Sequence, residues 1–359
     1  MTRLTREQTE AFQAELDALR DETMAQVGEV DARRLRRVVR TARGSAVAGR
    51  GLLMFGFDPI TWVLGTLSLA LAKILDNMEI GHNVMHGQYD WMNDPHLNSK
   101  TFEWDLVCDS GHWKHYHNYE HHTHTNILGK DHDLGYGMLR VTDRQKWSRF
   151  NLLQPLWYAL LALLFQWGVG IHDVKIGRWF MGKMSREEFR ARIAPFLAKT
   201  KRQLFKDYVL FPLIGFWNAP RILLGNLVAN GIRNVWTNAV IFCGHFSEGA
   251  RVYSLKETAN ETRGDWYLRQ LQGSCNIEGS KLMYVMTGHL SHQIEHHLFP
   301  DVPAPRYQEM APRVREICAR YGLPYNSASF ARQYSSVLWN LFRLSFPTRR
   351  PRAAQVAVA

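Results

Sequence analysis

The sequence predicts an all-α integral membrane protein, in which a few membrane helices carry a large polar cap rich in histidine. Residues 150–171 contain no Asp, Glu, Lys or Arg over 22 positions, enough to cross a hydrocarbon core of roughly 30 Å. The mean hydropathy of the chain is nevertheless negative, so lipid-facing helices make up only part of it. The 16 histidines are concentrated in a few short polar segments, which predicts a metal site in the cap.

The N-terminal part, residues 1–44, is charged and amphipathic and is predicted to be a basic helical segment. Six arginines between Arg33 and Arg43 directly precede the first apolar run. Residues 45–75 then form a short membrane segment that is interrupted at Asp58-Pro59, because proline disfavours the helical conformation of the residue before it. If the basic N-terminus is cytoplasmic, this segment enters and leaves the membrane on the same side, as a hairpin.

The remaining parts follow from the alternation of polar and apolar sequence. In chain order they are cap residues 76–149, a membrane segment near 150–171, a second near 208–246, cap residues 247–340 and a flexible tail at 347–359. Residues 45–346 are thus expected to form one membrane domain.

The number of membrane crossings stays open at this level. The histidine clusters of the two cap parts must meet on one side of the membrane, so an even number of crossings separates them. Three apolar runs compete for these crossings, at 150–171, 208–220 and 222–246. The basic stretch 175–206 favours a shallow position for the first run, whereas its full length without charges favours a crossing.

The formal charge of +11 is concentrated next to the apolar runs. Basic residues on the cytoplasmic face of a membrane protein, attracted to anionic headgroups, explain this better than a nucleic-acid surface. The first residues show no signal peptide. The four cysteines are widely spaced, which indicates reduced thiols rather than a zinc site or a disulfide framework. We therefore expect contacts with membrane lipid and no nucleic-acid partner.

A stripe of amides marks the last apolar run. Asn226, Asn230, Asn234 and Asn238 recur every fourth residue, and the same helix face continues to His245. Polar residues in an apolar helix face the protein interior. The stripe therefore predicts either a helix that lines the site or hydrogen bonds between packed helices.

The histidines form three clusters with helical spacing. His82 and His86 are separated by four residues, and segments 117–122 and 292–297 share the pattern His-x-x-Glu-His-His. Imidazole suits Zn, Cu, Fe and Ni, and this number of histidines exceeds what one ion can bind. No His-Glu-x-x-His motif is present, so a zinc peptidase loses its usual support. A dinuclear iron or copper site that performs redox chemistry on an apolar substrate is the better interpretation.

At these clusters the sequence resembles the membrane fatty-acid desaturase family, whose members carry three histidine boxes. Box one lies in 76–86, box two spans 117–126 and is followed by Gly-Lys-Asp-His-Asp at 129–133, and box three is Gln-Ile-Glu-His-His-Leu-Phe-Pro at 293–300. The third string is the most specific. The resemblance covers roughly residues 50–320 and is closest to bacterial acyl-CoA and acyl-lipid desaturases.

The resemblance implies two iron ions bound by histidines of the three boxes and by one more near the end of a membrane helix. The implied ligands are His82, His86, His117, His121, His122, His245, His296 and His297. In box three the resemblance favours Gln293 at the first position, whereas the internal match with box two favours His292, so both remain candidates. His112, His115, His124, His132 and His289 are weaker candidates, and His172 is expected to be structural.

Ligating imidazoles need an acceptor for the second ring N–H. The candidates near the boxes and on the amide stripe are Asp76, Glu79, Glu120, Asn126, Asp131, Asp133, Glu295 and Asn238.

The resemblance also implies O₂-dependent desaturation of a long-chain fatty acyl-CoA or acyl-lipid in the bacterial inner membrane, with the cap facing the cytoplasm. The sequence contains no His-Pro-Gly-Gly string of a fused cytochrome b5 and no dinucleotide fingerprint, so electrons are expected from a separate ferredoxin or cytochrome b5-like protein with its reductase. The double-bond position would be set by the shape of a tunnel, with Trp62, Trp91, Trp104, Trp113, Trp236 and Trp266 as wall candidates.

A related di-iron hydroxylase or terminal-alkene-forming fatty acid enzyme is an alternative, since it would use similar boxes. A His-rich membrane metal-binding or transport protein is the alternative from another class.

Overall fold

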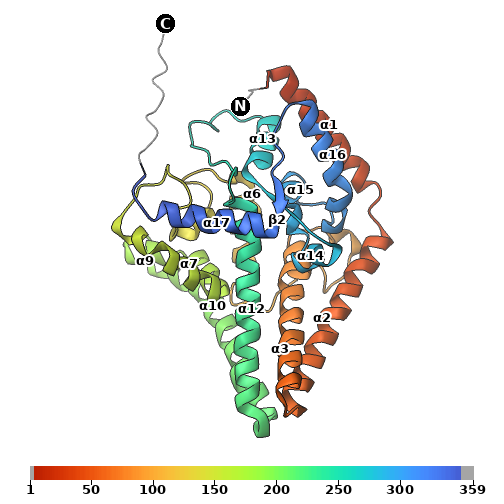
Figure 1. The fold of residues 1–359 in the computed structure, drawn as a ribbon, viewed down its shortest axis with the longest axis vertical. Coiled ribbons are helices and arrows are strands. Elements are labelled where there is room, and N and C mark those ends of the chain that lie inside the picture. Colours follow the sequence, from red (N-terminus) through yellow and green to blue (C-terminus); the bar gives the residue numbers. More distant parts are fainter. Residues whose placement is uncertain (1–3, 349–359) are drawn as a thin grey trace.

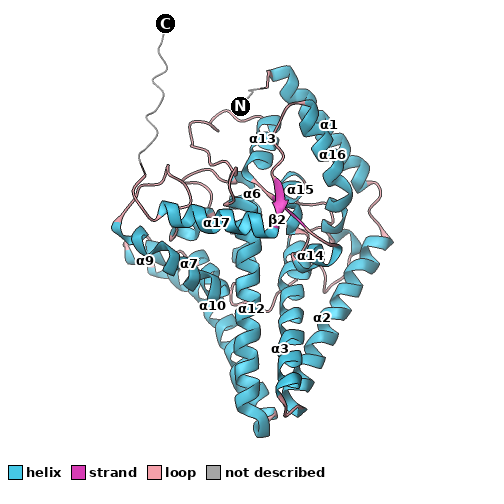
Figure 2. Ribbon diagram, in the orientation of Figure 1, coloured by secondary structure: helices cyan, strands magenta, loops and turns pink. Residues whose placement is uncertain are grey.

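The computed structural model describes residues 4–348, whose regular secondary structure is helical apart from one short sheet (Figure 2). This sheet has two parallel strands, β1 (Asn276–Glu278) and β2 (Ser327–Ser329), paired from their first residues onward. The predicted all-α fold class is therefore confirmed. Of the predicted tail at 347–359, the positions from 349 onward lie outside the described residues.

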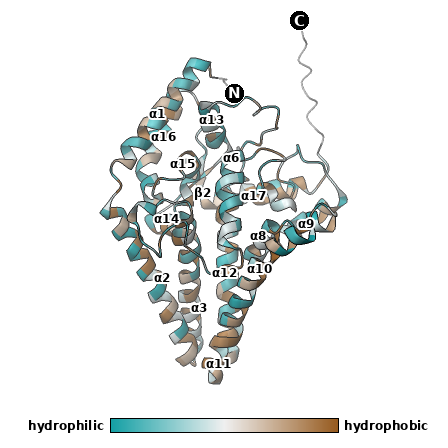
Figure 3. Cartoon of the chain, turned by 180° about the vertical axis from the view of Figure 1, so that it is seen from behind, coloured by the Kyte–Doolittle hydropathy of each residue, from teal (hydrophilic) through white to brown (hydrophobic). Residues whose placement is uncertain are grey.

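Four helical arms extend from the cap and converge at the opposite end of the molecule (Figure 1). They are α2 (Glu29–Phe55), α3 (Pro59–Ile74), the run of α10 (Arg186–Phe205), η6 (Lys206–Leu210) and α11 (Phe211–Ile214), and α12 (Ala219–His245). Apolar residues are concentrated in the parts of the arms distant from the cap (Figure 3). The arms form two hairpins, one from α2 and α3 and one from the α10 run and α12.

The first hairpin turns at the predicted break. Asp58 caps α3, because its Oδ1 accepts hydrogen bonds from the backbone N–H groups of Ile60 (2.9 Å) and Thr61 (3.0 Å), and Pro59 occupies the first helical position. The two helices pack closely through glycine, since a Cβ on Gly49 would lie 2.8 Å from the carbonyl oxygen of Gly65. Small residues at such contacts are typical of membrane helix pairs.

Polar side chains join the tips of the two hairpins. Asn218, in the turn η7 (Phe216–Asn218), donates to the carbonyl groups of Leu53 (3.1 Å) and Gly56 (2.7 Å). Trp217 donates through Nε1 to the carbonyl group of Met54 at 2.8 Å. These bonds satisfy carbonyl groups at the end of α2 that have no partner within the helix.

The charge-free run 150–171 is not one straight membrane helix. After the turn η5 (Arg149–Leu153), it forms α7 (Gln154–Leu163) and α8 (Phe165–Asp173), which are bent by 96°. The bend falls at Leu164, whose φ of −108° and ψ of 27° lie outside the helical range. Figure 1 shows α7 beside α17 (Phe330–Leu344), near the cap. The choice between a shallow position and a crossing, left open by the sequence, stays a prediction for this bent run.

Only one helical run in the described part of the chain, Pro59–Met85, is by itself long and apolar enough to cross a membrane. It continues α3 into the segment predicted as cap, so box one lies at the cap end of a membrane arm. The run from α10 to α11 meets the criteria of length and apolar character only together with residues 216–245, across a bend of 102°. Two arms thus separate box two from box three, and the boxes meet at the same end of the bundle.

The basic stretch 175–206 is mostly helical. It forms α9 (Ile176–Phe180) and α10, and α10 continues without a break into the apolar residues of η6 and α11. Residue 44, predicted as the end of the N-terminal segment, likewise lies inside α2. Both α2 and the run from α10 to α11 therefore begin in basic sequence and continue into apolar sequence without a break.

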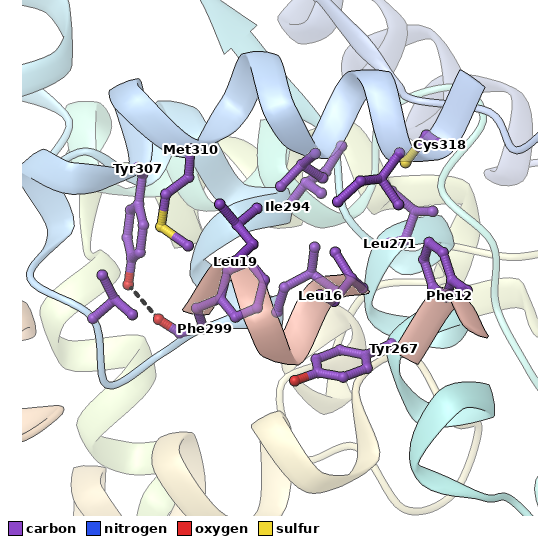
Figure 4. Close-up of a cluster of buried hydrophobic side chains, with 14 of the residues drawn as sticks. Phe12, Leu16, Leu19, Tyr267, Leu271, Ile294, Phe299, Tyr307, Met310 and Cys318 are labelled. Atoms are coloured by element: carbon purple, nitrogen blue, oxygen red, sulfur yellow. Dashed lines mark hydrogen bonds between the residues drawn. The ribbon is translucent and has the colours of Figure 1, made fainter. Parts of the chain in front are cut away.

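The cap core connects the N-terminal helix α1 (Arg6–Met24) with α13 (Arg263–Gly273) and α16 (Tyr307–Arg320). Figure 4 shows Phe12, Leu16 and Leu19 of α1 packed in this cluster, which also contains Ile294 and Phe299 next to box three. Tyr307 donates to the carbonyl group of Phe299 at 3.0 Å. The N-terminal helix thus covers the segment that carries the third histidine box.

The other cap elements are short. They are η1 (Leu75–His82), α4 (Asn83–Met85), η2 (Asp90–Met92), α5 (Ser110–Trp113), η3 (Lys114–His121), α6 (His122–His124), η4 (Leu134–Gly137), α14 (Lys281–Met286), η8 (Leu290–His292), α15 (Gln293–Leu298) and η9 (Ala304–Arg306).

Candidate metal centre

Four segments bring the histidine boxes together. Box one lies at the junction of η1 and α4, box two on η3 and α6, box three on α15, and His245 is the last residue of α12. Both η1 and η3 are π-helical. Such turns are uncommon and occur frequently at functional sites, since the extra residue per turn re-aims the side chains.

The histidines form overlapping groups whose ring nitrogens lie within 4.8 Å of one another. One group contains His82, His86, His117 and His296, a second contains His121, His245 and His297, and His122 joins His296 and His297 in a third. Asp133 forms a further group with His117 and His121. All eight predicted ligands are thus gathered in one place, and their role in metal binding stays a prediction.

Ring nitrogens within these groups point at each other. His82 Nε2 lies 3.3 Å from His117 Nε2, and His245 Nε2 lies 3.1 Å from His297 Nε2. Further ring nitrogens are buried and have no hydrogen-bond partner among the described residues; they are His86 Nε2, both nitrogens of His122, His245 Nδ1 and His296 Nε2. Buried polar atoms normally have partners, so this donor set fits bound metal ions.

The protonation state also fits. Burial, followed by the other histidines, lowers the pKa well below the usual 6.5 for His86, His117, His122, His296 and His297. These imidazoles are therefore neutral at pH 7, the form that binds metal. Burial acts in the same direction on His121, but the carboxylate of Asp131 outweighs it and raises the pKa of His121.

Two of the predicted supporting carboxylates contact ligand candidates. His121 Nδ1 lies 2.9 Å from Asp131 Oδ1, and His117 Nδ1 lies 3.4 Å from Asp133 Oδ2. Asp131 is itself held by the backbone N–H groups of Asn126 (2.7 Å) and Asp133 (2.9 Å). Asn126 thus supports the site through its backbone. This network fixes the ring orientation of His121.

Other predicted supporting residues contact different groups. Glu79 Oε2 lies 2.9 Å from His289 Nδ1, outside the metal groups, and Glu120 lies near His115 (3.4 Å). Glu295 accepts from Asn276 and Tyr325. The carboxylate of Asp76 accepts from the backbone of residue 105, and the side chain of Asn238 has no hydrogen-bond partner among the described residues. Proximity in sequence to the boxes was a poor guide for these residues.

Several partners were not predicted. His297 Nδ1 lies 3.0 Å from Gln270 Oε1 and 3.3 Å from Thr125 Oγ1, and His296 Nδ1 lies 3.4 Å from the Tyr307 hydroxyl. His82 Nδ1 lies 3.0 Å from Asn83 Oδ1. Gln270 precedes His297 by 27 residues and Tyr307 follows His296 by 11; neither belongs to a motif, so no sequence signal pointed to them.

Box three favours Gln293 over His292 as the residue facing the metal groups. Gln293 Nε2 lies 2.9 Å from His245 Nε2, and its Oε1 has no partner among the described residues. His292 belongs to the preceding turn and its ring packs against Tyr284. Gln293 starts α15 and precedes His296 by three residues, which puts both on one helix face.

The weaker histidine candidates lie outside the metal groups found in the described residues. His172 Nε2 lies 2.8 Å from the carbonyl oxygen of His132, and the two rings stack. His132 in turn contacts Asp173 at 3.3 Å. The expected structural role of His172 fits this packing.

A cavity, here called the central cavity, extends from the histidines along α12. Its wall includes His82, His117, His121, His245 and Gln293, the apolar and aromatic residues Trp104, Trp113, Tyr136, Phe165, Ile241 and Phe246, and the charged residues Asp131, Asp133, Asp173 and Arg233. Of the six predicted wall tryptophans, only Trp104 and Trp113 line it. The arrangement can hold an extended apolar molecule with one section against the histidines.

The amide stripe on α12 is divided between two tasks. Asn234 lines the central cavity. Asn226 and Asn230 instead donate to Asp207, through its carbonyl group and its carboxylate respectively. Both alternatives left open by the sequence therefore apply, each to a different part of the helix.

The comparisons with known proteins agree with this site. The family model "Fatty acid desaturase" matches residues 59–329. Two curated relatives from strains of Mycobacterium tuberculosis, each called "NADPH-dependent stearoyl-CoA 9-desaturase", are 48% identical over 350 residues, covering 96% of this chain and 82% of their own length.

More distant relatives are similar over a smaller part of the chain. The "sn-1 linoleoyl-lipid 6-desaturase" of Synechocystis is 26% identical, covering 75% of this chain and 77% of its own. Human "Fatty acid desaturase 3" is 26% identical, covering 78% and 61%. With its histidine boxes gathered beside the central cavity and with these matches, the chain belongs to the membrane fatty acid desaturase family and is an oxidoreductase.

Proposed function

We propose that this enzyme uses two iron ions and O₂ to introduce a double bond into a long-chain fatty acyl-CoA. The observation that carries the proposal is the set of overlapping buried histidine groups beside the central cavity. Neutral imidazoles without hydrogen-bond partners are the ligands that such ions require. Bound iron would supply the activation of O₂ for removal of two hydrogen atoms from adjacent methylenes.

The substrate proposal rests on the Mycobacterium tuberculosis relatives. Because they are named as stearoyl-CoA 9-desaturases and are 48% identical over nearly the whole chain, we infer a saturated C18-type acyl-CoA and the ninth position. The Synechocystis relative named for a lipid substrate is only 26% identical. An acyl-lipid substrate is therefore the second choice.

The residues of the chain provide binding and position rather than acid–base chemistry, since a methylene offers no proton of suitable acidity. The apolar wall holds the acyl chain extended, and its shape decides which carbon lies against the histidines. Asp131 and Gln270 hold His121 and His297 in one orientation. The amide of Gln293 lines the cavity beside His245, where it positions that ring.

Electrons are proposed to come from a separate ferredoxin or cytochrome b5-like protein and its NADPH-dependent reductase, in line with the names of the relatives. The cap is proposed to face the cytoplasm of a bacterial inner membrane. The basic segments at 33–43 and 175–206 support this orientation, because such residues favour the cytoplasmic side.

Product analysis tests the proposal. The chain is expressed in a bacterium with a ferredoxin and its reductase, beside a His296→Ala control, and total fatty acids are profiled by gas chromatography and mass spectrometry. A new unsaturated species that is absent from the control is expected, with the double bond at the ninth carbon after derivatisation. Hydroxylated chains or 1-alkenes would move the assignment to the related di-iron reactions. No new product together with no bound iron would refute the proposal.

A further inference from the structure

A second hollow, here called the polar cleft, lies between α2, α3, η6 and the loop before α5. Its charged and titratable lining residues are Arg43, Arg50, Lys73, Asp76, His96, Asp105, Lys206 and Arg233. Arg233 lines both the polar cleft and the central cavity. Asp76 faces the cleft, and the next residue, Asn77, lines the cavity. The two hollows are therefore separated by a single layer of side chains.

The charge of one buried carboxylate in this region, that of Asp207, is balanced by basic side chains. Asp207 is completely buried and accepts from Arg50 at 3.0 Å, from Lys73 at 2.8 Å and from Asn230 at 3.3 Å. Burying one charge without its partners is strongly unfavourable, so this set keeps Asp207 ionised. Its role is to hold α2, α3, η6 and α12 together.

Asp76 is different, because it forms no salt bridge with any residue that the structure describes. Its Oδ2 accepts only the backbone N–H of Asp105, at 3.3 Å. The side chain of Asp105 is 42% exposed and pairs with Lys206 and, at 3.8 Å, with Lys73. Asp76 thus lies one step inward from a solvent-exposed carboxylate, and it is free to bind or release a proton.

The residues on the inner side of Asp76 reach the central cavity. Asn77 donates to Thr237 Oγ1 at 2.8 Å, and both residues line the cavity. Arg233 is only 1% exposed, and its Nε–H has no hydrogen-bond partner in the described part of the chain. A buried cationic donor of this kind can hold an ordered water, and ionisable residues inside a membrane protein commonly line proton paths.

The proposed function requires such a path, and the inference rests on it. Desaturation converts –CH₂–CH₂– and O₂, with two electrons from the donor and two protons from solvent, into –CH=CH– and two molecules of water. Two of the four electrons that reduce O₂ come from the C–H bonds. The histidines are buried and the cavity is largely apolar, so the two solvent protons need a polar route.

We propose that the polar cleft is the proton inlet of this enzyme, with Asp105 at its mouth, Asp76 as the proton carrier and Arg233 as a positioning residue that orders water between cleft and cavity. Protons pass from Asp105 and bulk water to Asp76 and then by water past Asn77 and Thr237. Asp207 serves as the structural counterpart, which is held ionised and takes no part.

Chemical labelling tests the carrier without any turnover. Dicyclohexylcarbodiimide is an apolar reagent that modifies protonated carboxyl groups, and it is applied to the full-length enzyme both with and without bound iron. Peptide mass spectrometry is expected to find modification at Asp76 and none at Asp207 in both samples. Modification of Asp207 and not Asp76, or of neither between pH 6 and pH 8, would overturn the inference.

Variants test the path during turnover. Asp76→Asn keeps the shape and the acceptor for Asp105 but removes the exchangeable proton, so desaturation is expected to fall by about tenfold or more. More peroxide should be released per O₂ and the H₂O/D₂O rate ratio should increase, with iron content and the KM for acyl-CoA unchanged. Asp76→Glu should restore most of the rate.

The results separate this inference from the proposed function. If the unmodified enzyme forms no unsaturated product, the proposed function fails. If it does, and an iron-loaded Asp76→Asn variant matches it in rate, peroxide release and isotope effect, only the proton inlet is refuted. Should Asp76→Asn lose iron, Asp105→Asn at the exposed mouth replaces it, with the same signature expected at smaller size and the same refuting result.

Discussion

Among the residues that contact the predicted metal ligands, Asp131 is the one whose loss should affect the metal site most. Its side chain is fully buried, and its Oδ1 lies 2.9 Å from His121 Nδ1 and accepts from the backbone of Asp133. Its Oδ2 accepts from the backbone of Asn126 at 2.7 Å. In Asp131→Asn, the amide oxygen can replace one of these carboxylate oxygens, and the NH₂ group cannot accept from the other donor.

The size of the effect follows from these contacts. One buried N–H left without an acceptor costs about 1–3 kcal/mol of stability. Loss of the carboxylate behind a ligating imidazole typically lowers metal affinity about 10–100-fold, which is about 1.4–2.8 kcal/mol of binding free energy. We expect Asp131→Asn to lose iron selectively from the group of His121, His245 and His297, so that about half of the iron remains.

The assay is iron analysis of detergent-purified protein during titration with a chelator, together with thermal unfolding. Asp133→Asn is the matched control, because Asp133 is 3.4 Å from His117 and its side chain is 18% exposed. It should weaken iron binding less than Asp131→Asn. Full retention of iron by Asp131→Asn, or a greater loss in the Asp133 control, would refute the reasoning.

Three further predictions concern stability and packing. The iron-free protein should lose stability as the pH falls from 7 to 5, because the five histidines with lowered pKa bind protons in the unfolded state before they do so in the folded state. Thermal unfolding measures this loss, and constant stability over this range would contradict the prediction. Gly244→Ala should reduce desaturation about tenfold or more, since its Cβ would lie 2.8 Å from the Gln293 side chain, whereas Gly231→Ala on the same helix has free space and should keep full activity. Arg306→Met removes the ion-pair partner (2.9 Å) of the Asp31 carboxylate, which is 1% exposed, and should destabilise the folded protein by about 3–5 kcal/mol. Arg313→Met, in an exposed ion pair with Glu22, should cost less than about 1 kcal/mol. Equal melting temperatures for these two variants would refute the difference expected between a buried and an exposed ion pair.

Local sequence determined the features that depend on neighbouring residues. The spacing of His82 and His86, and the repeated pattern that starts at His117, put imidazoles on shared helix faces. Asp58-Pro59 marked the turn of the first hairpin, because capping and the proline ring act over one or two residues. Local geometry set the histidines within each box, and the packing of separate segments brought all eight predicted histidines into one site.

Tertiary structure decided the features that depend on partners distant in the chain. Gln270 and Tyr307 support His297 and His296 only because α13 and α16 pack over α15, whereas the acidic residues beside the boxes, Glu79 and Glu120, bind elsewhere.

The bend at Leu164 has the same origin. The sequence around Leu164 is apolar and has no Gly or Pro at that position. The helices on both sides contact α12, and in addition α7 packs against α17 and α8 against η4. Apolar composition therefore specified that this run is removed from water, and only the packing of the whole chain decided its direction, because the hydrophobic effect depends on the area buried and carries no preferred orientation.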